Sequence, residues 1–140
     1  MKAGTVIAAP LLAAALLILA ACGRGSGDSS PPAGLAPTLD SIQANVFTVT
    51  CAVSGCHGGA GAQQGLRLDP GFSAGNLINV PSPRDASLIR VVPGDPDASF
   101  LIQKLDGTQT LGVRMPDGGP YLTTATVNVI RQWIQDGAPQ

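Results

Sequence analysis

The stretch Cys51-Ala52-Val53-Ser54-Gly55-Cys56-His57 organises the chain, because it gathers two thiols and an imidazole within seven residues. His57 is the only histidine, and it directly follows the second cysteine. Positions five apart on an α-helix differ by about 140° in azimuth, so two thiols with this spacing cannot face one flat group from a regular helix. We therefore expect the segment to bulge at Ser54 and Gly55, since glycine accepts a positive φ without steric cost.

The order of the three side chains is the one that covalent haem attachment requires. Two cysteine sulfurs add to the two haem vinyl groups, and the histidine that follows ligates the iron. The stretch resembles the attachment sites of c-type cytochromes. Its four intervening residues, where the common spacing has two, resemble one branch of monohaem cytochrome c domains and some haem sites of multihaem cytochromes. The resemblance implies that Cys51, Cys56 and His57 bind one haem c and that His57 is an iron ligand.

The first 21 residues have the pattern of a bacterial targeting segment. Lys2 begins it, an apolar run follows, and small residues precede Cys22. The run is marginal for a membrane span and resembles a lipoprotein signal, in which Cys22 is lipidated and becomes the new N-terminus. A plain secretory signal and an uncleaved anchor are the alternatives. Gly23 favours the outer membrane, so we expect a lipoprotein of the bacterial cell envelope that faces the periplasm or the cell surface.

Three regions follow from composition. Residues 1–21 are the signal, residues 22–37 are the lipidated cysteine and a flexible Gly/Ser/Pro tether, and residues 38–140 are one small domain. Only 4% of the chain is aromatic, so the domain has little apolar volume of its own, and a buried haem would add to it. We expect an all-α, cytochrome c-like small helical domain with long loops, wrapped around one covalent haem.

Capping residues and apolar spacing place three helices. The first has a possible cap at Thr38 and an apolar stripe of Leu39, Ile42, Val46 and Val49. The second begins at the cap Asp95 and closes at Gly107. The third follows Thr123 or Thr124, buries Val127, Ile130 and Ile134 with Trp133 on its flank, and ends at Gly137. Between the first two we expect loops with a short strand or helical turn, where one backbone carbonyl accepts the Nδ1 proton of His57.

Met115 is the only methionine besides Met1. Pro116 biases its backbone toward an extended conformation, so the thioether projects from a loop. Met115-Pro116 resembles the distal-ligand loop of cytochrome c, which implies that Met115 is the sixth iron ligand. A methionine that fills a gap in the core is the alternative, with Lys104, Tyr121 or an open position then left for the iron.

These features predict a membrane-tethered electron-transfer protein rather than an enzyme. A haem with His and Met ligands has no free position for substrate, so its partners are redox proteins. Two alternatives stay open: a five-coordinate haem enzyme or sensor, and a haem-free structural lipoprotein with a Cys51–Cys56 disulfide. A zinc site is a weaker one, because Cys51, Cys56 and His57 supply only three ligands.

Charge contributes little to the prediction. The formal net charge is −1, and no basic patch or aromatic platform indicates nucleic acid as a partner. Four arginines are candidates to pair with haem propionates: Arg67, Arg84, Arg90 and Arg114. We favour Arg90 and Arg114, which flank the expected loops, and expect the other two to face solvent.

Overall fold

The computed structural model describes Met1 and residues 32–140. The rest of the predicted signal, Cys22 and most of the predicted tether lie outside the described residues. In the described part the elements are, in order, α1 (Leu39–Ile42), the π-helix η1 (Gln43–Cys51), the 3-10 turn η2 (Gln63–Gly65), α2 (Ser73–Leu77), β1 (Pro81–Ser82), β2 (Asp85–Ile89), α3 (Phe100–Asp106) and α4 (Thr124–Gln135). No helix in this part is long and apolar enough to cross a membrane.

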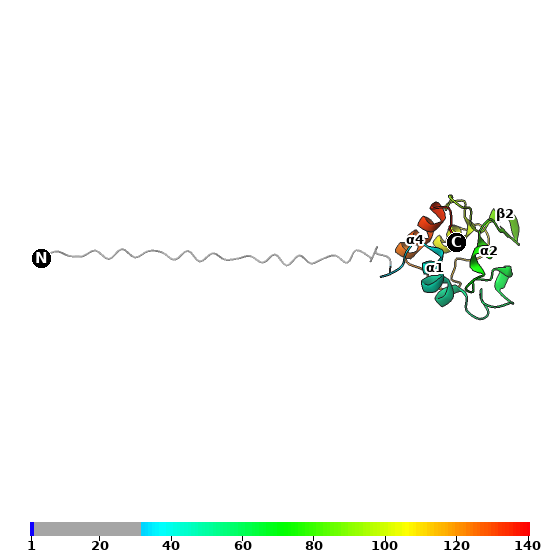
Figure 1. The fold of residues 1–140 in the computed structure, drawn as a ribbon, viewed down its shortest axis with the longest axis horizontal. Coiled ribbons are helices and arrows are strands. Elements are labelled where there is room, and N and C mark those ends of the chain that lie inside the picture. The colour runs from blue at the N-terminus through cyan, green and yellow to red at the C-terminus, as the bar shows by residue number, and fades with distance from the viewer. Residues whose placement is uncertain (2–31) are drawn as a thin grey trace.

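The domain is small and mostly helical, and it carries one antiparallel hairpin. Strands β1 and β2 pair with Pro81 opposite Ile89 and Ser82 opposite Asp85. The sequence predicted an all-α domain with at most a short strand. The structure has a two-stranded hairpin in addition to the helices. α4 lies on one side of the domain and the hairpin on the other (Figure 1).

The first helix changes its winding after one turn. Thr38 caps it as predicted, because its Oγ1 accepts a hydrogen bond of 3.3 Å from the amide of Ser41. Beyond Ile42 the chain forms a π-helix, whose bonds span five residues and turn fewer degrees per residue. The apolar stripe therefore ends early: Val46 is buried, but Val49 is 63% exposed, so its predicted place on the buried face was wrong.

Helix α3 begins at Phe100, later than its sequence predicts. The carboxylate of Asp95 accepts a hydrogen bond of 3.0 Å from the amide of Ala98, so it caps a turn that precedes the helix. The buried hydroxyl of Ser99 donates to the carbonyl of Asp95 at 2.7 Å and accepts from the amide of Val92 at 2.9 Å, which fixes this turn. The predicted end is confirmed, because Gly107 closes the helix with a left-handed φ of 83°.

Helix α4 has both of the ends that its sequence predicts. Thr123 Oγ1 accepts from the amide of Thr126 at 3.1 Å. At the other end the amides of Gly137 and Ala138 donate to the carbonyls of Ile134 and Trp133, which is the Schellman arrangement. Trp133, expected on the flank, is fully buried, and its indole N–H donates to the carbonyl of Pro139 at 2.9 Å.

One apolar core joins the elements. It contains side chains from the first helix, from α3, from α4 and from the loops between them, including Ile42, Phe47, Leu68, Leu77, Ile102, Leu105, Val127, Ile130 and Trp133. Leu35, in the segment that composition assigns to the tether, is also buried in this core, with 8% of its surface exposed. The packed domain therefore includes residues just before Thr38.

Replacing Thr123 with alanine removes the cap of α4. We expect Thr123→Ala to lower the free energy of unfolding by about 1 kcal/mol, because an amide at the helix N-terminus loses its acceptor. The matched control is Thr124→Ala, since Thr124 is exposed and its side chain caps nothing. Chemical denaturation measures both variants, and equal losses would contradict the assignment of the cap.

Candidate functional site

The stretch from Cys51 to His57 folds back on itself as the spacing predicts. Cys51 is the last residue of η1, the amide of Cys56 donates to the carbonyl of Val53 at 3.0 Å, and the amide of His57 returns to the carbonyl of Cys51 at 3.1 Å. Gly55 takes a φ of 81°, which a residue with a side chain rarely adopts. The bulge brings both ends of the stretch next to each other.

The backbone at Gly58 lies close to the backbone of the bulge. A Cβ atom at this position would lie 2.5 Å from the carbonyl oxygen of Ala52 and 3.2 Å from that of Val53. Both contacts are with backbone atoms, which cannot rotate away as the end of a side chain can. Only glycine therefore fits where the loop after His57 passes behind the bulge.

The imidazole of His57 bonds to a backbone carbonyl, as expected. Its Nδ1 lies 3.1 Å from the carbonyl oxygen of Leu66, and the amide of Leu68 donates to the carbonyl of His57 at 2.8 Å. A carbonyl only accepts, so this bond requires the proton on Nδ1 and leaves the Nε2 lone pair available for a metal. Burial lowers the pKa of His57, although its bond to Leu66 opposes the shift, and the neutral imidazole is favoured.

Both thiols of the stretch are free. Cys51 is half-buried against the core and Cys56 is exposed. Burial, together with a smaller contribution from the nearby Cys56, raises the pKa of Cys51 to about 11, so Cys51 is a neutral thiol at pH 7. Across residues 32–140 no three His, Cys, Asp or Glu side chains gather closely enough to hold a metal ion among themselves.

The loop that carries Met115 is attached to the end of α3. The amide of Met115 donates to the carbonyl of Lys104 at 2.8 Å, and Nε of Arg114 donates to the carbonyl of Leu105 at 2.8 Å. The Met115–Pro116 peptide is cis. The side chain of Met115 is half-buried and packs against the apolar core.

The candidate ligands share neighbours. Cys51, Leu66 and Met115 all pack against the same apolar core. The charge of Lys104 contributes to the lowered pKa of His57, while the carbonyl of Lys104 holds the amide of Met115. The carbonyl of Lys104 thus holds the backbone of Met115, and Cys56 lies on the surface.

Three of the four arginines considered for haem propionates have partners in the chain. Arg67 pairs with Asp69 at 2.6 Å, and Arg114 lies 4.2 Å from the centroid of the Tyr121 ring. Arg90 is only 8% exposed and donates to the carbonyls of Asn76 and Gln64 at 2.8 and 2.7 Å.

Arg90 therefore braces the loops on which His57 depends, a role that sequence reasoning missed. Gln64 belongs to η2, the turn that leads directly to Leu66. The signal was present in the sequence, because Arg90 is the one charged residue in the apolar run Leu88-Ile89-Arg90-Val91-Val92.

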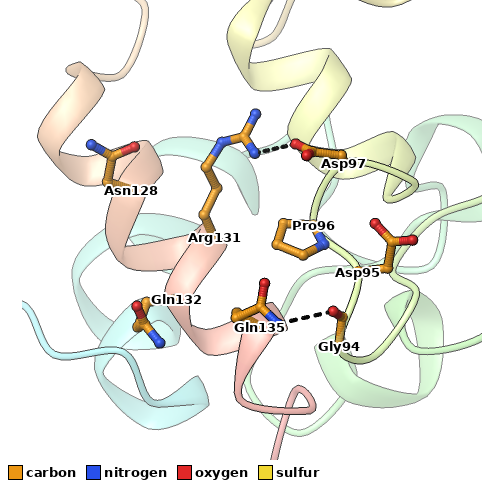
Figure 2. A pocket seen from close by; sticks show the side chains of 8 residues that line it. All are labelled: Gly94, Asp95, Pro96, Asp97, Asn128, Arg131, Gln132 and Gln135. Carbon is orange, nitrogen blue, oxygen red and sulfur yellow. Dashed lines mark hydrogen bonds and ion pairs between the residues drawn. The ribbon is translucent and has the colours of Figure 1, made fainter.

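Two hollows lie away from these residues. A polar one of about 420 Å³ is bordered by α4 and the turn before α3, where Arg131 pairs with Asp97 and Gln135 bonds to Gly94 (Figure 2). A second of about 260 Å³ lies between η1 and the start of α4. Neither is lined by Cys51, Cys56, His57 or Met115.

Comparison with known proteins gives no relative: no family model, curated protein or solved structure matches this chain.

Adding one methyl group at Gly58 tests the close approach behind the bulge. We expect Gly58→Ala to lower the free energy of unfolding by about 1–3 kcal/mol, because the new Cβ overlaps backbone atoms. Gly61→Ala is the control, since a Cβ there meets nothing within 4 Å. Thermal or urea unfolding of the two variants separates them, and equal stability would show that the loop is open at Gly58.

Proposed function

We propose that the chain is a membrane-tethered monohaem c-type cytochrome that transfers electrons, with a cytochrome c-like fold. The observation that carries this proposal is the loop from Cys51 to His57. It presents two free thiols and then an imidazole whose Nδ1 bonds to Leu66, which leaves Nε2 as the donor atom. A covalent haem held there would supply one-electron chemistry.

The donor set suits haem iron. An imidazole and a thioether are neutral ligands that together favour the reduced state more than two imidazoles do. The carbonyl of Leu66 fixes the orientation of His57 and increases its basicity. The bonds of Met115 and Arg114 to α3 brace the second ligand, so the protein has little to rearrange when an electron arrives or leaves.

The exposure of Cys56 supports electron transfer to another protein. Cys56 is exposed, so a group attached there has an edge near solvent. The partners that fit are redox proteins, and we propose no nucleic acid partner and no substrate-transforming reaction.

The tether would keep this domain near a membrane. The signal-like residues 1–21 and Cys22 support lipidation at Cys22, followed by about 12 residues before the buried Leu35, which reach roughly 40 Å when extended. A domain on such a tether is free to turn between an electron donor and an acceptor. We propose a cell-envelope location, at the outer membrane facing the periplasm or the cell surface.

Covalent attachment can be tested by mass. Expressed with the machinery that matures c-type haem, the denatured protein is expected to keep a mass increment of one haem, because thioether bonds survive unfolding. Cys51→Ser combined with Cys56→Ser removes both bonds and is expected to lose the increment, whereas the control Ser54→Ala keeps it. A wild-type protein without the increment, with both thiols oxidised to a disulfide, would overturn the proposal in favour of a structural lipoprotein.

Ligation by Met115 is tested separately. We expect Met115→Ala to keep the covalent haem but to lose the weak far-red sulfur-to-iron band and become high-spin when oxidised. Val113→Ala is the matched control, because Val113 is in the same loop and 50% exposed. A Met115→Ala protein with an unchanged low-spin spectrum would assign the sixth ligand to another residue. A high-spin wild type would favour the five-coordinate enzyme or sensor.

A further inference from the structure

The loop that carries Met115 caps the C-terminal end of α3. The last carbonyls of a helix have no hydrogen-bond partner within the helix. In α3 they accept hydrogen bonds from residues that follow the helix. The carbonyl of Gln103 accepts from the amides of Gly107 and Thr108. The next two carbonyls, of Lys104 and Leu105, accept from Met115 and Arg114, as described above.

Lys104 also holds the same loop with its side chain. Its ammonium donates to the carbonyl of Leu111 at 3.3 Å and to the carbonyl of Val113. Gly112, between these two, takes a φ of 75°, and a Cβ atom there would lie 3.0 Å from Nζ of Lys104. The loop therefore curves closely around the ammonium of Lys104. Lys104 binds the loop at three places, once through its carbonyl and twice through its ammonium.

The carbonyl dipoles of Leu111 and Val113 stabilise the positive charge of Lys104. The ion pairs within residues 32–140 are made by Arg67 and Arg131, not by Lys104. Hydrogen bonds from a charged donor are stronger than those between neutral groups, and partial burial strengthens them further. Lys104 is half-buried, and its bond to Leu111 is partly shielded from water, while its bond to Val113 is exposed.

We propose that Lys104 is a positioning residue for Met115, which keeps the thioether in place by fixing residues 111–115 against α3. This inference rests on the proposed function, in which Met115 is the sixth ligand. A movement of the loop that takes Met115 away from the iron breaks the bonds to the Lys104 ammonium and carbonyl. The residue thereby sets how readily another ligand replaces the thioether.

The test is a titration of the oxidised haem protein with imidazole, followed by loss of the far-red sulfur-to-iron band. We expect Lys104→Met to bind imidazole about tenfold more tightly than wild type, because two charge-assisted bonds no longer hold the loop. Lys104→Arg keeps a charged donor and is expected to restore most of the wild-type affinity. Arg84→Met is the matched control, since Arg84 is a cation beside Gly112 and is expected to change the affinity less than twofold.

A second variant acts on the loop without changing Lys104. Gly112→Ala places a Cβ against Nζ at a positive φ, so it is expected to tighten imidazole binding in the same direction, while Gly61→Ala does not. A general structural role would lower the melting temperature and leave the imidazole affinity unchanged, and that result in both Lys104→Met and Gly112→Ala would overturn the inference. A wild type without the far-red band would instead show that the proposed ligand pair, on which the inference depends, is wrong.

Discussion

The hydrogen bond between Nδ1 of His57 and the carbonyl of Leu66 is the contact on which the candidate site depends. It decides which nitrogen carries the proton, and so it leaves Nε2 as a donor atom. It also joins the attachment stretch to the chain that follows, together with the bond from Leu68 to the carbonyl of His57. Without it, the imidazole would have no fixed orientation relative to the chain that follows the attachment stretch.

The position of Leu66 has its own support. It follows η2, where Gln64 holds a left-handed backbone with a φ of 56°, a conformation unfavourable for a residue with a side chain. The guanidinium of the buried Arg90 stabilises this conformation, because it donates hydrogen bonds to the carbonyls of Gln64 and Asn76. A buried charge that has only carbonyls as partners is costly to leave unpaired, so the contact constrains these loops strongly. In our account the first ligand is oriented through Arg90 and the second through Lys104.

The sequence predicted those features that depend on neighbouring residues. The caps at Thr38 and Thr123 and the ends at Gly107 and Gly137 follow from side-chain oxygens and from glycine at left-handed positions, and all four are observed. The bulge after Cys51 and a carbonyl partner for His57 also followed from spacing and ligand chemistry.

The features that sequence reasoning missed depend on distant contacts. The π-helical winding turns Val49 to the surface, although its spacing from Ile42 fits an α-helical stripe. Ser99 delays the start of α3 through bonds to Val92 and Asp95, which no local pattern indicates. Arg90 was favoured as a propionate partner because it flanks the expected loops, and only its two carbonyl acceptors show how the burial of its charge is compensated.

The measurement that tests the central claim most directly is the absorption spectrum of the wild-type protein, oxidised and reduced, after expression with the c-haem maturation machinery. Our account predicts sharp α and β bands in the reduced protein and the weak far-red sulfur-to-iron band in the oxidised protein, as low-spin His57 and Met115 ligation requires. A protein without haem, or with a high-spin haem in both states, would contradict it.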